Sequence, residues 1–350
     1  MMTRINPEFT NELKKYGAFD PNACYNCGNC TAVCTLSDEQ NSFPRKMVRY
    51  SVLGLQDDIQ TSLDPWLCYY CGECSTTCPR EADPGELMMS LRRWLIARYD
   101  WTGLSGVLYK SPLASVAAFL VLAALVVWFG ISMHFQLDTI MHYGHLFEMA
   151  AIAGVFVFIL IPNLIHMWWL TVYKSGIRAP VSKYFTTAGN LIVHMFTQKR
   201  TLDCEENQIR WFEHFILVLG YLSLLITTVF LDWFSTQSMV IIVLGYLESA
   251  VIFIVTFDFI RRRIQKDKEI SKHSHPSDWL FVIWLFLMGL TAFGVRLFID
   301  LNIIENNVWI FVIQMIVLVQ WALIIVPFGK WTHFLYRSFA MYFHEIIQPD

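Results

Sequence analysis

Eight of the nine cysteines lie in two copies of one pattern, CYNCGNCTAVC from position 24 and CYYCGECSTTC from position 68, and each copy has gaps of two, two and three residues. Three cysteines at gaps of two can wrap the chain around one 4Fe-4S cluster, while the fourth cysteine ligates the other cluster when a protein holds two. The pattern therefore predicts two clusters, the first bound by Cys24, Cys27, Cys30 and Cys78 and the second by Cys68, Cys71, Cys74 and Cys34.

Two four-cysteine zinc sites are the alternative interpretation of the same residues. Zinc modules usually use two C-x-x-C pairs with a longer spacer, so the pattern favours iron and sulfur. Gly28 and Gly72 fit the close approach of the backbone to a cluster that this wrapping requires. The two copies differ at the residue after the last cysteine, which is Pro79 in the second copy and Thr35 in the first, so a different local turn is expected there.

The rest of the chain is strongly apolar. The whole sequence of 350 residues is 55% hydrophobic and 16% charged, with a net charge of −3. A segment of about 20 apolar residues can cross the bilayer core, and six such helices leave no amphipathic helices to cover them in a soluble fold. The expected fold is all-α, with a ferredoxin-like domain followed by a six-helix transmembrane bundle. The six stretches are Leu113–Met133, Met149–Leu170, Phe215–Leu231, Met239–Val255, Trp279–Ile299 and Val308–Phe328.

The basic residues predict how these helices cross the membrane. Lys and Arg are enriched in cytoplasmic loops, and here they precede the first stretch and follow the second and the fourth, whereas segments 134–145, 233–238 and 300–307 contain none. No apolar signal sequence is visible within the first 30 residues. We therefore expect a multi-pass protein of the inner (cytoplasmic) membrane with both termini and the cysteines in the cytoplasm, where thiols stay reduced and bind metals.

The segments around the cysteines are expected to be helical. Between the two copies, Met47, Val48, Val52 and Leu55 recur at helical spacing after Ser42, a candidate N-cap. After the second copy, residues 85–101 form a predicted basic amphipathic helix with Trp94 and Trp101 at the membrane surface. This gives two domains, residues 1–110 with the clusters and this linker helix, and residues 111–350 in the membrane. The first resembles the all-helical dicluster ferredoxin module of fumarate and succinate reductases and of the heterodisulfide reductase C protein.

Histidines on facing helices are the usual ligands of a membrane haem b. His214 in RWFEHFILVLGYL and His333 in VPFGKWTHFLYRSF both lie near the expected cytoplasmic boundary. Over residues 200–340 these two segments resemble the ligand helices of the respiratory nitrate reductase γ-subunit family of cytochromes b. The resemblance implies one haem b held by His214 and His333. At the positions of that family's outer pair of histidines this chain has Leu224 and Met315, so a second haem is not expected there.

An outer haem bound by His134 with His142 or His145 is the rival arrangement, and we place these two residues in or beside a loop. With a single inner haem, a quinone near the outer face would be most of the roughly 30 Å core away from it. We therefore expect the quinone in the inner leaflet, near His166, Lys330 and the Trp168–Trp169 pair.

Two further residues lie outside these sites. Glu248 is a carboxylate inside the fourth stretch, either a proton-handling group or a buried partner of Arg296. Cys204 stands alone, without an assigned role.

Dicluster domain and cytochrome together resemble the membrane subunits of quinone-interacting membrane-bound oxidoreductase complexes, which are similar to a fusion of the heterodisulfide reductase C and E proteins. The resemblance implies electron transfer between menaquinone or menaquinol and cytoplasmic flavoprotein and iron–sulfur partners of the heterodisulfide reductase A type, with adenylylsulfate reductase as the acceptor or donor. Substrate chemistry would then lie on other subunits. The alternatives are a membrane component of a heterodisulfide reductase-type complex and a membrane-anchored iron–sulfur redox sensor. No feature indicates nucleic-acid binding.

Overall fold

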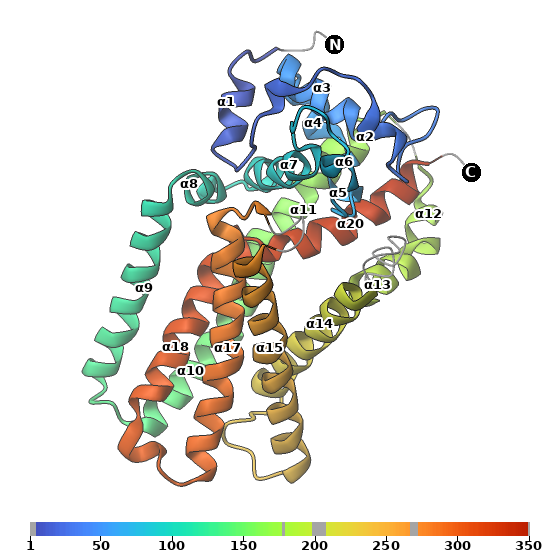
Figure 1. The fold of residues 1–350 in the computed structure, drawn as a ribbon. Coiled ribbons are helices and arrows are strands. Elements are labelled where there is room, and N and C mark those ends of the chain that lie inside the picture. The colour runs from blue at the N-terminus through green and yellow to red at the C-terminus, as the bar shows by residue number, and fades with distance from the viewer. Residues whose placement is uncertain (1–4, 177–178, 198–207, 267–271, 349–350) are drawn as a thin grey trace.

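The computed structural model describes residues 5–176, 179–197, 208–266 and 272–348, and helices are the regular elements within these ranges. A domain of short helices, residues 5–110, lies at one end of a bundle of long helices (Figure 1). We call the end of the bundle that carries this domain the cluster end and the opposite end the far end. The short helices are α1 Phe9–Lys14, η1 Pro21–Ala23, α2 Asn29–Ala32, α3 Arg45–Leu53, α4 Gln56–Thr61, α5 Asp64–Leu67, α6 Glu73–Thr76, α7 Pro84–Tyr99 and α8 Leu104–Lys110.

Six helical segments are long and apolar enough to cross a membrane, as the sequence predicts. Large apolar side chains such as Leu113, Phe230 and Val240 are exposed on the bundle, and lipid would cover them. The all-α fold with six candidate membrane helices is thus confirmed. The six segments are Pro112–Ser132 (α9), Leu137–Tyr173, Gln208–Val229 (α14), Met239–Gln265 (α15), Pro276–Asp300 (α17) and Trp309–Ile347.

The second membrane segment begins earlier than the sequence predicts. It consists of α10 Leu137–Val155, a π-helical turn at Phe156–Leu160, α11 Ile161–Trp168 and a second π-helical turn at Trp169–Tyr173. His142 and His145 therefore lie within α10, and the expectation that they lie in or beside a loop is wrong. Two shorter helices follow, α12 Val181–Thr186 and α13 Ala188–Thr197.

The last membrane segment is broken near the cluster end. It runs through α18 Trp309–Gln320, a π-helical turn at Trp321–Ile325 and α19 Val326–Phe328, and after Gly329 and Lys330 it continues as α20 Trp331–Ile347. A Cβ on Gly329 would lie 2.7 Å from the Ile325 carbonyl oxygen, so only glycine fits this bend. Helix α20 then runs beneath the cluster domain (Figure 1). His333 is in the first turn of α20 and does not end the spanning helix.

The helices of the bundle pack closely where small residues allow it. A Cβ on Gly289 of α17 would lie 2.9 Å from backbone atoms of Ser249 and Phe253 in α15. Near the far end, a Cβ on Gly245 would overlap the Trp233 ring, which is fully buried. A short 3-10 turn, η6 Ile304–Asn307, joins α17 to α18. Helices α15 and α17 thus form a rigid pair on which the cluster domain can be positioned.

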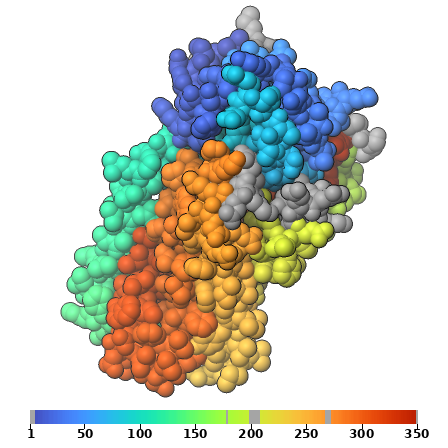
Figure 2. All heavy atoms as spheres, viewed as in Figure 1, coloured from blue at the N-terminus to red at the C-terminus, as the bar shows by residue number. Residues whose placement is uncertain are grey.

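Helix α7 is the centre of the cluster domain. Figure 2 shows this domain seated against the end of the bundle. Fourteen of the sixteen residues of α7 are buried, among them Trp94. The expectation of an amphipathic helix with Trp94 at the membrane surface is therefore wrong, whereas Trp101, which follows α7, is 63% exposed. Its two adjacent arginines, Arg92 and Arg93, face protein instead of lipid head groups and are 2% and 4% exposed.

Arg93 joins the cluster domain to the bundle through buried ion pairs. Its guanidinium lies 2.9 Å from a carboxylate oxygen of Glu86 and 2.8 Å from one of Asp278, in the first turn of α17, and it donates to the Tyr16 carbonyl at 2.8 Å. Asp278 also pairs with Lys330 Nζ at 2.6 Å. Burial alone would lower the pKa of Arg93, but the two carboxylates raise it above its ordinary value.

Removing one partner from this network leaves charges buried without compensation. We expect Asp278→Ala to destabilise the protein by about 3–5 kcal/mol, because Arg93 and Lys330 lose their shared carboxylate. Asp20→Ala breaks the exposed Lys14–Asp20 pair, whose side chains are 46% and 47% exposed, and is expected to cost less than about 1 kcal/mol. Thermal unfolding of both variants in detergent tests this, and equal losses of stability would contradict the assigned role of Asp278.

Candidate iron–sulfur site

The two cysteine runs fold in the same way. In each run the second residue after the first cysteine, Asn26 or Tyr70, has a positive φ, 59° or 57°, and its N–H donates to that cysteine's sulfur, at 3.3 Å to Cys24 and 3.4 Å to Cys68. Gly28 and Gly72 follow with φ of 94° and 95° and precede α2 and α6. Both glycines therefore occupy the left-handed conformation that a tight wrap of the chain requires.

The first cysteine group surrounds a small cavity. Its lining includes Cys24, Cys27, Cys30 and Cys78, the four residues that the sequence assigns to one cluster, together with Arg45 and Arg80. Burial raises the pKa of the Cys30 thiol, and the nearby Cys24, Cys27 and Cys78 thiols raise it further. Cys27 is exposed, so this group lies at the surface of the domain.

The second cysteine group lies deeper, toward the bundle, with Cys68 and Cys74 buried. Burial raises the pKa of Cys34 to about 11, and the Cys68, Cys71 and Cys30 thiols add to the rise. Burial likewise raises the pKa of Cys74, and the Cys68, Cys71 and Cys34 thiols raise it further. The position of Cys78 in the lining of the first cavity agrees with the crossed grouping, which remains a prediction.

The thiols suit clusters that they surround. Within the described residues no three His, Cys, Asp or Glu side chains converge closely enough to hold a single ion, while four cysteine sulfurs around one cavity match the ligand set of a 4Fe-4S cluster. Repulsion among so many buried thiolates would be relieved by binding iron, because metal ligands must be deprotonated. The exact ligand set of each cluster remains a prediction.

Arg92 connects the second cysteine group with the membrane segment. Its guanidinium donates to the Pro65 carbonyl at 2.6 Å, to the Trp66 carbonyl at 3.2 Å and to the Cys68 carbonyl, and its Nη1 lies 3.2 Å from Nε2 of His333. The Trp66 ring packs 5.8 Å from the His333 ring. Sequence reasoning gave Arg92 only a topological role. The adjacent arginines lie in a helix that is apolar on more than one face, and this pattern could have indicated that they are buried.

The two predicted haem ligands lie at the same end of the bundle on separate helices. His214, in the second turn of α14, packs 6.1 Å from the Phe259 ring, and its Nδ1 is buried without a hydrogen-bond partner in the described part of the chain. Lys330 and Arg337 lie close enough to both histidines to interact electrostatically with them. An unsatisfied imidazole nitrogen fits metal ligation. Nε2 of His333, by contrast, is engaged by Arg92.

The residues predicted to hold a quinone have separate protein partners. Nδ1 of His166 lies 3.1 Å from the Tyr99 carbonyl, Trp168 donates to the Tyr184 hydroxyl at 3.1 Å, and Trp169 stacks on Tyr173 at 4.2 Å. Lys330 is held by Asp278. These residues lie near the cluster end but are not brought together around one cavity, so the inner quinone site remains a prediction.

Glu248 and Arg296 do not pair. Glu248 is 5% exposed and accepts a hydrogen bond from the Ser223 hydroxyl. Arg296 pairs with Asp300 at 2.7 Å and donates to the Trp233 carbonyl at 2.6 Å. The alternative in which Glu248 is the partner of Arg296 is therefore wrong, and a proton-handling role for Glu248 remains a prediction.

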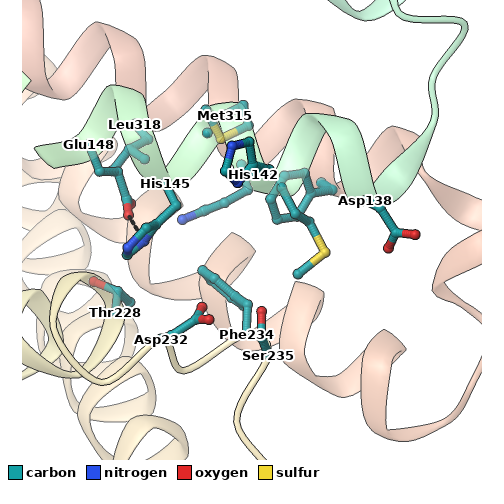
Figure 3. A pocket seen from close by; sticks show the side chains of 14 residues that line it. Asp138, His142, His145, Glu148, Thr228, Asp232, Phe234, Ser235, Met315 and Leu318 are labelled. Carbon is teal, nitrogen blue, oxygen red and sulfur yellow. Dashed lines mark ion pairs between the residues drawn. The ribbon is translucent and has the colours of Figure 1, made fainter. Parts of the chain in front are cut away.

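A larger cavity of about 260 Å³ lies at the far end between α10, α18 and the segment after α14 (Figure 3). His145 Nδ1 is 4.0 Å from a Glu148 carboxylate oxygen, and His142 lies one turn away on the same helix. His134 is not among the lining residues. Sequence reasoning missed the acidic side chains that complete this cavity, although Glu148 follows His145 by one helical turn. These acidic residues are Asp138, Glu148 and Asp232.

Residues 20–82 match the family model of the 4Fe-4S dicluster domain. Searches of curated proteins and of solved structures found no match to this chain. The match covers both cysteine runs and, with their eight cysteines, implies two 4Fe-4S clusters. The chain is therefore an iron–sulfur electron-transfer protein whose dicluster domain is followed by six candidate membrane helices. Cys204 lies outside the described residues.

The crossed grouping predicts which substitutions remove the same cluster. Cys78→Ala should abolish the same EPR signal of the reduced protein as Cys24→Ala, and Cys34→Ala the same signal as Cys68→Ala, with non-haem iron falling from about eight to about four atoms per chain in each case. Cys204→Ser is the control and should keep both signals. If Cys78→Ala removed the signal that Cys68→Ala removes, each run would bind its own cluster and the crossed assignment would be wrong.

Proposed function

We propose that this chain is the membrane subunit of a quinone oxidoreductase complex and carries electrons between menaquinone or menaquinol and cytoplasmic partner proteins. The observation that supports this most directly is the position of Arg92, which contacts both the Cys68 carbonyl and His333. A single side chain, Arg92, therefore bridges the second cysteine group and the membrane segment. A membrane-anchored redox sensor would not require this continuity.

The difference in exposure between the two cysteine groups supports an electron path that runs from the membrane through the second group to the first group at the surface. Cys68 is 7% exposed and faces the bundle, whereas Cys27 is exposed and its neighbour Tyr25 is 70% exposed. Bound clusters supply one-electron carriers at these two places. The residues of the second group thus hold the carrier nearest the membrane, and those of the first group hold the carrier nearest a soluble partner.

The surface around the first group is suited to a partner with an acidic rim. Arg45 and Arg80 line its cavity, and Arg80 lies over the Tyr25 ring at 4.1 Å. Complementary charge steers association and fixes orientation. The proposed partners are flavoprotein and iron–sulfur subunits of the heterodisulfide reductase A type, and adenylylsulfate reductase is the proposed terminal acceptor or donor. Substrate chemistry would take place on those subunits.

The proposed sidedness places both termini and the cluster domain in the cytoplasm of an inner-membrane protein. The described chain ends at the cluster end, beside the N-terminal domain (Figure 1). Arg262 and Arg263 at the end of α15 lie at this end, whereas Asp138 and Asp300 lie at the far ends of α10 and α17 and Asp232 lies in the segment after α14. This distribution of charge agrees with the positive-inside rule.

A haem b would be bound by His214 and His333 at the cluster end. When bound, it supplies a one-electron carrier between the membrane and the second cysteine group. Ligation through Nε2 of His333 excludes the contact of that nitrogen with Arg92, which keeps its three backbone carbonyl partners. Lys330 and Arg337, both near the two histidines, could balance the haem carboxylates.

Haem content tests this part of the proposal. We expect about one haem b per chain, lost in His214→Ala and in His333→Ala but retained in His145→Ala, with about eight non-haem irons in every variant. Pyridine haemochrome spectra and iron assays of the purified proteins give both numbers. Haem that survives both inner substitutions and is lost in His145→Ala would instead place the ligands in the far-end cavity.

We propose that the quinone head group binds near the cluster end, close to Lys330, His166 and Trp168, because the second cysteine group faces the bundle there. Lys330 can donate a charge-assisted hydrogen bond to a quinone oxygen. The far-end cavity is the second candidate, favoured by its volume and by the His145–Glu148 pair, which could accept the protons of a quinol.

A dye-coupled assay separates the two quinone sites. With reduced benzyl viologen as donor and a menaquinone analogue as acceptor, Lys330→Gln should raise the KM for the quinone about tenfold or more, because one charge-assisted hydrogen bond is lost. His145→Gln should leave KM within about twofold. The reverse pattern would place the quinone in the far-end cavity, and no quinone reduction by the parent protein would contradict the proposed function.

A further inference from the structure

We propose that Arg92 is a positioning residue that sets the reduction potential of the second cluster. It holds the backbone that leads into Cys68 and places a buried positive charge, which has no charged hydrogen-bond partner among the described residues, beside this member of the second group. This inference rests on the dicluster domain and on the predicted ligands of the second cluster. It does not depend on whether a quinone or a haem exchanges electrons with that cluster.

Arg92 completes a helix end beside the second group. Helix α5, Asp64–Leu67, ends one residue before Cys68, and the last carbonyl groups of a helix lack partners within it. Arg92 supplies them: Nε donates to the Pro65 oxygen at 2.6 Å, and Nη2 donates to the Trp66 oxygen at 3.2 Å and to the Cys68 oxygen. One rigid guanidinium therefore fixes the position at which Cys68 enters the second group.

The charge of Arg92 is not neutralised by these contacts. In the described part of the chain the hydrogen-bond partners of Arg92 are uncharged: backbone carbonyls, the Met89 sulfur at 3.6 Å and the His333 ring. Its neighbour Arg93 is instead neutralised by Glu86 and Asp278. The guanidinium is protonated, because arginine side chains do not lose their proton in folded proteins.

This charge acts on Cys68. Nη2 of Arg92 donates to the Cys68 carbonyl, and the Arg92 side chain is buried, so the guanidinium lies beside the backbone of a predicted cluster ligand where water is excluded. Reduction adds one electron and thus one negative charge to a cluster and its thiolates. A nearby buried cation therefore favours the reduced state and raises the reduction potential, since charges interact strongly where water is excluded.

The first cysteine run provides an internal comparison. There η1, Pro21–Ala23, precedes Cys24 as α5 precedes Cys68, and the arginine that donates to its end is Arg80, whose Nε lies 3.5 Å from the Ala23 oxygen. Arg80 is exposed, so water screens its charge. The first run therefore has a similar arginine contact, but a longer and more exposed one. Arg92 gives the second cluster a higher reduction potential than it would have without this charge.

The experiment is an EPR-monitored redox titration of the purified full chain in lipid nanodiscs, with chemical mediators and no quinone. The Cys34→Ala and Cys78→Ala variants assign the two signals. In Arg92→Gln the ratio of reduced to oxidised second cluster at the parent's midpoint potential should fall about tenfold, equivalent to ~59 mV for a one-electron couple. Arg92→Lys should shift it less, and the first cluster should not shift in either variant.

Arg98→Gln is the matched control. Arg98 is on the same helix, its side chain is 41% exposed, and it lies 3.8 Å from a carboxylate oxygen of Glu12, so neither potential should change. If Arg92→Gln binds less than about eight irons, Arg92→Lys decides, because it keeps the charge but loses the planar fork. An unchanged second potential in the iron-replete variant, or an equal shift of both clusters, would overturn the proposal. If the parent protein failed to reduce a quinone but the potential of the second cluster shifted as expected in Arg92→Gln, only the proposed function would be contradicted.

Discussion

Two adjacent arginines of α7 are buried together, and the arrangement of the cluster domain on the bundle depends on how their charges are satisfied. A buried charge is costly unless protein groups replace its water. Arg93 recruits Glu86 from its own helix and Asp278 from α17, which lies 185 residues further along the chain. Arg92 turns to the backbone around Cys68 and to His333. One helix therefore locks the domain onto the membrane segments and also adjoins the second cysteine group.

The break in the last membrane segment allows the contact between this segment and α7. Because the helix bends at Gly329, α20 lies beneath the cluster domain instead of extending away from it. His333 in its first turn reaches Arg92, and Tyr336 one turn on packs against Trp66 and Tyr99. Lys330, at the bend itself, completes the ion network through Asp278. Anchoring of the domain and its proximity to the membrane thus have the same structural cause.

Sequence patterns predicted the parts of the fold that depend on local spacing. The cysteine gaps predicted a dicluster domain, Gly28 and Gly72 marked the left-handed turns, and apolar runs located six membrane segments. The connection between the cysteine runs is helical as expected, in α3 and α4, although Val52 is 42% exposed and Ser42 does not cap α3 with its side chain.

Features that depend on distant partners were not predictable in this way. The arginines of α7 were expected to face the membrane surface, because the carboxylate that pairs with Arg93 belongs to Asp278, which is remote in sequence. Arg296 suggested Glu248 as its partner by membrane depth, but Asp300 lies on the same helix one turn away. The part of α10 that contains His142 and His145 was not predicted to be helical, because polar residues at the end of an apolar run are also typical of a loop.

The proposed function requires that the clusters exchange electrons with a quinone in the membrane. The most direct measurement is to reduce the full chain in proteoliposomes with dithionite, remove the excess, add a menaquinone analogue without oxygen and follow the EPR signals of the reduced clusters. Both signals should disappear, and one quinol should form, with uptake of two protons, for every two electrons withdrawn. Signals that persist with the quinone, yet vanish when a soluble one-electron oxidant is added, would contradict it.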